Sequence, residues 1–72
     1  MSAALYDHEK LRAWRAESGL TRTEASHAVG IAYPTLADLE AGRYPNPTVE
    51  MLTRLAEVYG RPVGALLPGA VA

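Results

Sequence analysis

The chain has 72 residues, and its seven Lys and Arg against eight Asp and Glu give a formal net charge of −1. A chain of this length forms one domain with a small core, since about 60% of its unfolded surface is buried on folding. There is no Cys, no apolar run of the ~20 residues that span a membrane and no signal-peptide pattern, which excludes disulfides, thiolate metal sites and membrane insertion and makes a cytoplasmic protein the expectation.

The composition favours an all-α fold. Ala and Leu dominate, Phe is absent, and no segment alternates apolar and polar residues as a strand does. Residues 1–6 are expected to form an N-terminal arm, with an extension of the first helix or a frayed end as alternatives. Asp7 is placed to cap a helix over 7–18. Trp14 follows Leu11 at helical spacing, which predicts a core anchor rather than a base-stacking platform.

Two short helices joined by a tight turn are predicted over 21–41. Thr21 and Glu24 have the spacing of a capping box, which starts a helix over 21–29 that ends at Gly30. Pro34 is compatible with the first turn of a second helix over 33–41. Two helices of this length with so short a turn make a helix-turn-helix, whose second helix can enter the major groove of DNA.

The last third of the chain predicts two more helices. Thr48 caps a helix over 48–59, and Pro62 opens a short one over 63–67. The residues 68–72 are expected to form a flexible tail. The longer helix has an expected core stripe that Met51, Leu55 and Val58 widen. Leu66 and Leu67 beside this widened stripe suggest either a fuller core or a patch for a homodimer. The core stripe consists of Val49, Leu52, Leu55, Ala56 and Tyr59.

An ordered set of residues extends across 9–67. It runs Leu11-x-x-Trp14-Arg15, Gly19-Leu20-Thr21, Glu24-Ala25, Gly30-Ile31, Leu39-Glu40-x-Gly42 and Asn46-Pro47. This set resembles the phage repressor/Cro-type (XRE-like) helix-turn-helix family, which implies a compact five-helix bundle of the lambda repressor-like class, with domain bounds of 7–67.

The resemblance also implies roles for several charged and polar residues. Arg15 and Glu40 match positions that join the first helix to the end of the recognition helix through a partly buried ion pair, with two solvated surface charges as the alternative. Arg22 and Arg43 match positions that contact DNA phosphates. Tyr44 adds a hydroxyl to the second of these contacts or covers the loop.

The outward positions of the 33–41 helix differ from the usual pattern, in which Gln, Asn, Arg or Lys read base edges. Tyr33, Thr35 and Asp38 are the hydrogen-bonding candidates. Tyr33, Pro34 and Ala37 are placed to pack against thymine methyl groups. Leu36 and Leu39 are expected to turn inward.

We therefore expect a sequence-specific regulator of transcription that binds double-stranded DNA, without a cofactor or metal. An enzyme is not expected, since no nucleophile–base set or metal-ligand cluster occurs. The alternative is a protein-interaction module on the same scaffold, such as an antitoxin or an adaptor for another regulator. The net charge of −1 keeps this alternative open, because nucleic-acid modules are usually basic. Arg22 and Arg43 beside the recognition helix would favour DNA, whereas dominance of Asp38 and Glu24 would favour a protein partner.

Overall fold

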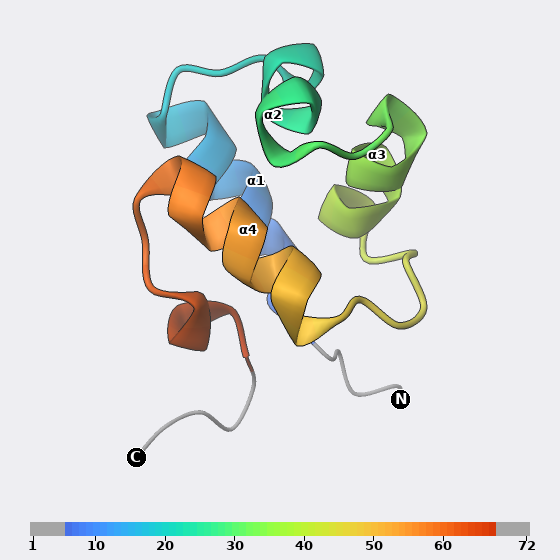
Figure 1. Ribbon diagram of the computed structural model, residues 1–72. Coiled ribbons are helices and arrows are strands. Elements are labelled where there is room, and N and C mark those ends of the chain that lie inside the picture. Colours follow the sequence, from blue (N-terminus) through green and yellow to red (C-terminus); the bar gives the residue numbers. More distant parts are fainter. Residues whose placement is uncertain (1–5, 68–72) are drawn as a thin grey trace.

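The computed structural model describes residues 6–67, and in this part of the chain it contains four α-helices, one turn of 3₁₀-helix and no strand (Figure 1). The all-α prediction is confirmed. The elements are α1 (His8–Glu17), α2 (Arg22–Val29), α3 (Tyr33–Ala41), α4 (Val49–Tyr59) and η1 (Val63–Leu66). None of these helices is both long and apolar enough to cross a bilayer.

The prediction of five α-helices is wrong at its last element. The segment predicted as a helix over 63–67 is a 3₁₀-helix of four residues, which is little more than one turn. Gly64 lowers the helix propensity of this turn. Leu67 has extended dihedrals, φ −97° and ψ 124°, as expected for a residue that precedes a proline. The chain therefore leaves helical geometry after a single turn.

The predicted helix starts are present as side-chain caps. Asp7 accepts a hydrogen bond from the Lys10 amide at 3.1 Å. Thr21 accepts from the Glu24 amide at 3.1 Å, and the Glu24 carboxylate accepts from the Thr21 amide at 2.9 Å, which completes the capping box. Thr48 caps α4 in the same way. At three of the four α-helix N-termini these bonds satisfy backbone amides that have no partner within the helix. Local sequence therefore sets where those three helices begin.

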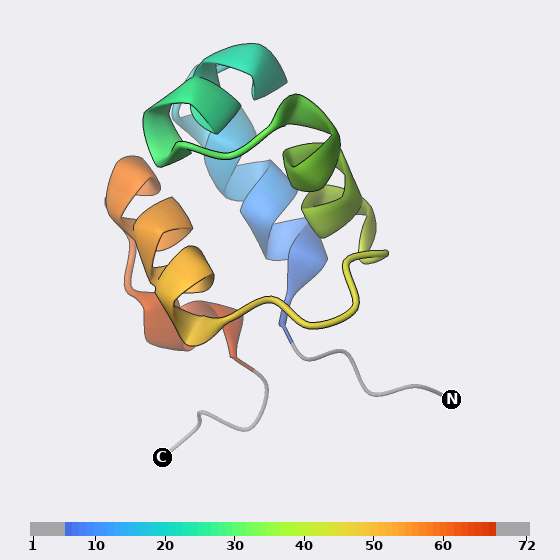
Figure 2. The same cartoon turned by 45° about the vertical axis from the view of Figure 1, so that its right-hand side comes forward.

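The core lies between α1, α3 and α4, with α2 across one end of the α1–α4 pair in both ribbon views (Figures 1 and 2). Trp14 is buried, so the prediction of a core anchor is confirmed. Val49 was expected in the core stripe but is 62% exposed. Side chains lean toward the N-terminus of their helix, so in the first turn of α4 Val49 projects past the end of the core. Six leucines are fully enclosed: Leu11, Leu36, Leu39, Leu52, Leu55 and Leu66.

The start of the described chain is fastened to two distant elements. The Tyr6 hydroxyl donates to the Leu39 carbonyl at 2.6 Å, and the Asp7 amide donates to the Leu66 carbonyl at 2.7 Å. Tyr6 is buried, so this residue of the expected arm belongs to the core instead. The rest of the arm and the expected tail, 68–72, lie outside the described residues.

Candidate nucleic-acid interface

The turn between α2 and α3 depends on a glycine with a positive φ. Gly30 ends α2 with φ 86° and ψ 33°, a left-handed conformation that residues with a Cβ rarely adopt. The amides of Gly30 and Ile31 both donate to the Ser26 carbonyl, at 2.9 and 3.0 Å. Ile31 is half-buried against the core. This turn directs α3 across α2 and leaves one side of α3 open to solvent.

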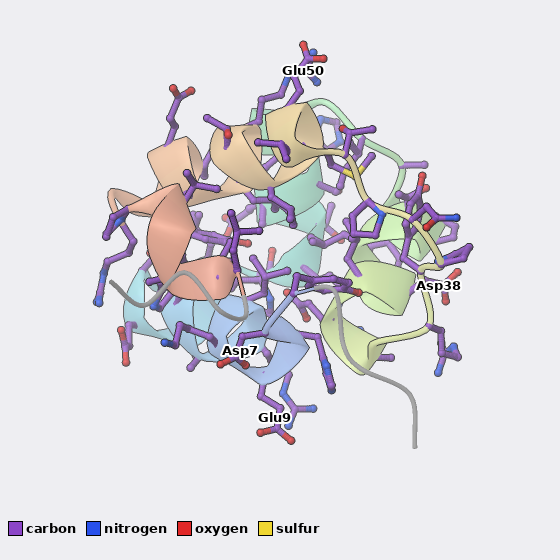
Figure 3. The ribbon with its side chains drawn as sticks, turned by 90° about the horizontal axis from the view of Figure 1, so that it is seen from below. Asp7, Glu9, Asp38 and Glu50 are labelled. Atoms are coloured by element: carbon purple, nitrogen blue, oxygen red, sulfur yellow. The ribbon has the colours of Figure 1, made fainter. Side chains whose placement is uncertain are left out.

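The exposed side of α3 carries the residues predicted to face bases. Tyr33 is 46% exposed and Pro34 is also exposed. Thr35, Ala37 and Asp38 are half-buried, and Asp38 lies at the outer edge of α3 in the view from below (Figure 3). The inward positions of Leu36 and Leu39 are confirmed. The most accessible polar groups of the α3 surface are therefore the Tyr33 side chain and the Asp38 carboxylate. Contact of this surface with DNA stays a prediction.

A buried carboxylate joins α3 to α1. Arg15 Nε donates to Glu40 Oε2 at 2.6 Å, and a terminal nitrogen of Arg15 donates to Oε1 at 3.2 Å. The Glu40 side chain is 1% exposed. A third donor of Arg15 reaches the Leu20 carbonyl at 3.1 Å. The pair that the sequence predicts is therefore present as a bidentate contact, and the alternative of two solvated charges does not apply.

Arg22 shares the same carboxylate. Its Nε donates to Glu40 Oε1 at 3.1 Å, and a terminal nitrogen donates to the Tyr33 hydroxyl at 3.4 Å. The guanidinium carbon lies 5.8 Å from the centroid of the Tyr33 ring, within cation–π range. The hydrogen bonds to Tyr33 and Glu40 raise the pKa of Arg22 above its ordinary value. From the sequence, Arg22 was expected to contact a DNA phosphate alone, and neither of these two contacts was predicted.

The second predicted phosphate contact is also paired. Arg43 donates to Asp38 Oδ1 at 3.0 Å, with the two side chains 68% and 46% exposed. Ion pairs this exposed are weak and exchange readily for other partners. Tyr44 is half-buried against the core, which fits the alternative in which it covers the loop.

The charges around α3 nearly balance. Arg15, Arg22 and Glu40 together carry one net positive charge, whereas Arg43 and Asp38 cancel. The exposed Glu24 carboxylate is held in its capping box at the start of α2. Arg22 thus contacts Tyr33 and Glu40 of α3, and Arg43 contacts Asp38 of the same helix. Neither sign of charge dominates this face.

A family model described as helix-turn-helix (HTH_3) matches residues 11–66. The transcriptional regulator DdrOP3 of Deinococcus deserti is 46% identical over 61 residues, covering 85% of this chain and 46% of that protein. The chain thus spans about half the length of this curated relative.

Two solved structures share the fold. The biofilm regulator SinR, in a complex with DNA, superposes with a TM-score of 0.73 at 23% identity, covering 78% of this chain and 89% of SinR. Hydroxypropylphosphonic acid epoxidase from S. wedmorenis gives a TM-score of 0.79 at 26% identity, covering 92% of this chain but 36% of the enzyme. The match of the family model over most of the chain shows that it belongs to the phage repressor/Cro-type (XRE-like) helix-turn-helix family.

Proposed function

We propose that this protein is a transcriptional regulator that binds double-stranded DNA sequence-specifically, with α3 in the major groove. The observation that carries the proposal is the geometry of α2 and α3, which leaves the α3 surface open with Arg22 and Arg43 at its two flanks. Membership of the helix-turn-helix family, the regulator DdrOP3 and the DNA complex of SinR support it.

The contacts divide into those that specify sequence and those that position the protein. Tyr33, Thr35 and Asp38 face base edges, and Pro34 and Ala37 face thymine methyl groups. The phosphate contacts come from Arg22, Arg43 and Tyr44. Because Tyr44 is half-buried against the core, we assign its phosphate contact to the hydroxyl alone.

The proposed regulator is a cytoplasmic homodimer on a two-fold symmetric site. The small core and the exposed Val49 on α4 support self-association. Met51 and Val58 contribute less than the sequence suggests, because they pack partly against the core. On a palindromic site the two copies of α3 would lie about 34 Å apart, one turn of DNA. Analytical ultracentrifugation with and without DNA tests this, and a monomer at all concentrations contradicts it.

Binding to a random duplex over a series of salt concentrations tests the function itself. With Arg22 and Arg43 as the cationic contacts of each protomer, a dimer forms roughly four, so log K should fall with log salt at a slope of about −4. The absence of binding at low salt would contradict the proposal that this protein binds DNA.

A second candidate is a protein-interaction module, such as an antitoxin or an adaptor. The near balance of charge around α3 favours it, because phosphate neutralisation supplies most non-specific DNA affinity. The same salt series separates the two functions. The fold shared with the epoxidase covers 36% of that enzyme and brings no activity to this chain, and we propose that the chain itself is not an enzyme.

A further inference from the structure

We propose that Tyr6 and His8 hold the C-terminal end of α3 in the position that its contacts with DNA require, so that two residues next to the start of α1 contribute to sequence specificity. This inference rests on the proposed DNA-binding function and adds positioning residues to it. We call Tyr6 and His8 the N-terminal clamp, because both contact the last turn of α3. The side chains that the clamp positions are Asp38 and Arg43.

Asp38 and Arg43 belong to one hydrogen-bonded turn that ends α3. The Arg43 amide donates to the Asp38 carbonyl at 2.9 Å. The Gly42 amide donates to the Leu39 carbonyl at 3.3 Å, and Gly42 has the positive φ, 78°, of a glycine that closes a helix in this way. The side chains of Asp38 and Arg43 pair across the same turn. The predicted base contact and the predicted phosphate contact therefore take their positions from one piece of backbone.

Tyr6 fixes this turn through the Leu39 carbonyl. The Tyr6 hydroxyl donates to that carbonyl at 2.6 Å, a shorter bond than the one from the Gly42 amide. Tyr6 is 4% exposed, so water has little access to the hydroxyl. Burial raises the pKa of Tyr6, and the charge of Asp38 raises it further. The hydroxyl is therefore bonded to the turn and close enough to Asp38 to be affected by its charge.

His8 covers the glycine of the same turn. A Cβ at position 42 would lie 2.9 Å from His8 Nδ1 and 3.0 Å from His8 Cε1, so the imidazole ring is in close contact with the Gly42 backbone. The rings of Tyr6 and His8 meet edge to face, with their centroids 6.3 Å apart. The two clamp residues thus support each other as well as the turn.

The clamp is itself fixed to other elements of the domain. Asp7, between its two members, donates its amide to the Leu66 carbonyl of η1 at 2.7 Å. The Asp7 side chain caps α1 by accepting from the Lys10 amide. Lys10 Nζ donates to the Ala65 carbonyl at 3.2 Å. The position of the α3 end therefore depends on α1 and η1, which are distant from it in the sequence.

The start of α3 is held by a different neighbour. Tyr33 lies six residues before Leu39, about 9 Å along the helix axis, and it contacts Arg22 of α2. Helix ends fray from their last turn, so a hydrogen bond lost at Leu39 loosens the end of α3 more than its start. This difference separates a positioning role of the clamp from a general loss of stability.

Amide hydrogen exchange in the free protein tests the clamp without DNA. Tyr6→Phe removes the hydroxyl and keeps the ring, so the amides of Gly42 and Arg43 should exchange about three- to tenfold faster, the worth of one hydrogen bond. The amides of Gly60 and Arg61 end α4 with the same pattern of bonds and serve as the internal control. Their exchange should not change. Equal acceleration at both helix ends would show only a less stable fold and would overturn the inference.

Tyr59→Phe is the matched control variant. It removes the hydroxyl of a second buried tyrosine, and that hydroxyl has no hydrogen-bond partner in the described chain. Exchange at Gly42 and Arg43 should then be as in wild type. His8→Ala removes the ring over Gly42 and leaves the Tyr6 hydrogen bond in place. It should also speed exchange at Gly42 and Arg43, and it decides the outcome if Tyr6→Phe does not fold.

Selection of duplexes from a random pool by the full chain tests the effect on specificity. The position that Asp38 contacts is identified as the one whose base preference changes in Asp38→Ala. Tyr6→Phe and His8→Ala should weaken the preference at that position about two- to threefold, the low end of the worth of one hydrogen bond, because Asp38 is displaced and not removed. Preferences at the other positions should stay as in wild type, and Tyr59→Phe should match wild type throughout.

The outcomes that overturn the inference differ from those that overturn the function. Unchanged exchange at Gly42 and Arg43 in Tyr6→Phe and His8→Ala would mean that the clamp does not hold α3. Faster exchange with an unchanged preference at the Asp38 position, or an Asp38→Ala variant with no altered preference, would mean that the clamp has no part in specificity. In these cases the DNA-binding function stands. Binding of no duplex by wild type would overturn the function and the inference together.

Discussion

Arg43 and Asp38 form an ion pair of 3.0 Å at the end of α3, so a predicted phosphate contact and a predicted base contact meet each other in the free protein. In the binding mode proposed above, Arg43 exchanges this carboxylate for a phosphate. Because both side chains are exposed, the exchange has a low free-energy cost. We therefore expect the pair to weaken binding to unselected DNA without preventing it.

Asp38→Asn should raise the affinity for random duplex DNA at low salt. The change removes a negative charge that faces the groove and releases Arg43 from its partner. Fluorescence anisotropy of a labelled duplex measures the effect. Glu50→Gln, which removes an exposed carboxylate of α4 (Figure 3), is the control and should have a smaller effect. Equal effects of the two changes would mean that net charge alone is responsible.

Arg43→Ala should lower the affinity for all sequences alike. Each lost phosphate contact reduces the salt slope by about one, so a dimer of this variant should show a slope of about −2. Salt titrations on a selected and a random duplex provide the measurement. A change confined to the selected duplex would show that Arg43 contacts bases.

Glu40→Ala should destabilise the fold by about 3 kcal/mol. The change leaves two guanidinium groups without their shared partner, one of them largely buried. Urea unfolding followed by the fluorescence of Trp14 gives the free energy. Glu17→Ala is the matched control, because its pair with Arg61 is exposed and should be worth less than about 1 kcal/mol. A loss of less than about half a kcal/mol in the free energy of unfolding of Glu40→Ala would show that the buried pair does not stabilise the fold.

Two buried tyrosines should respond differently to the loss of their hydroxyl. The Tyr6 hydroxyl donates to the Leu39 carbonyl, whereas the buried Tyr59 hydroxyl has no partner in the described chain. Tyr6→Phe should cost about 1 kcal/mol, and Tyr59→Phe should be neutral or stabilising. Thermal unfolding of both variants beside wild type measures the difference. A clear loss in Tyr59→Phe would indicate that a bound water satisfies its hydroxyl.

Tyr59 should also make stability depend on alkaline pH. Burial, with a smaller effect of Glu40, raises the pKa of Tyr59 from 10.0 to about 12. Between these values the unfolded chain loses the proton that the folded chain keeps, so this contribution to stability is complete below pH 10 and declines as the pH rises toward 12. At pH 11 wild type should have lost about 1 kcal/mol more than Tyr59→Phe, relative to pH 8. Parallel urea curves at the two pH values test this.

Local signals made most of the fold predictable. Helix ends are set by residues close by in the sequence: Thr21 and Glu24 cap the start of α2, Gly30 ends it, and Thr48 caps the start of α4. The bounds of these helices therefore follow from the sequence. The end of the chain was harder, because Val63–Leu66 has apolar residues but too few to complete an α-helix. Val49 fits the periodicity of α4, yet its place in the first turn leaves it beyond the core.

In the candidate site, a contact between two side chains could be predicted only where the family pattern includes both positions. Arg15 and Glu40 are 25 residues apart, and the resemblance brings them together. The contact between Arg22 and Glu40 spans 18 residues, and no periodicity or cap connects them. The positive charge of Arg22 was the available signal, because a second cation near a buried carboxylate will pair with it. The Tyr6 contact with Leu39 spans 33 residues and left no such trace.

The hydrogen bond between the Asp7 amide and the Leu66 carbonyl has a consequence for attachment. It brings the two limits of the described chain together, at the end of the molecule away from α2 (Figures 1 and 2). A domain fused beyond either limit would therefore be attached at the end of the molecule opposite the α2–α3 turn. Positions 6 and 67 are also close enough for a short linker. A circular permutant with its new ends in the loop between α3 and α4 would keep every helix uninterrupted.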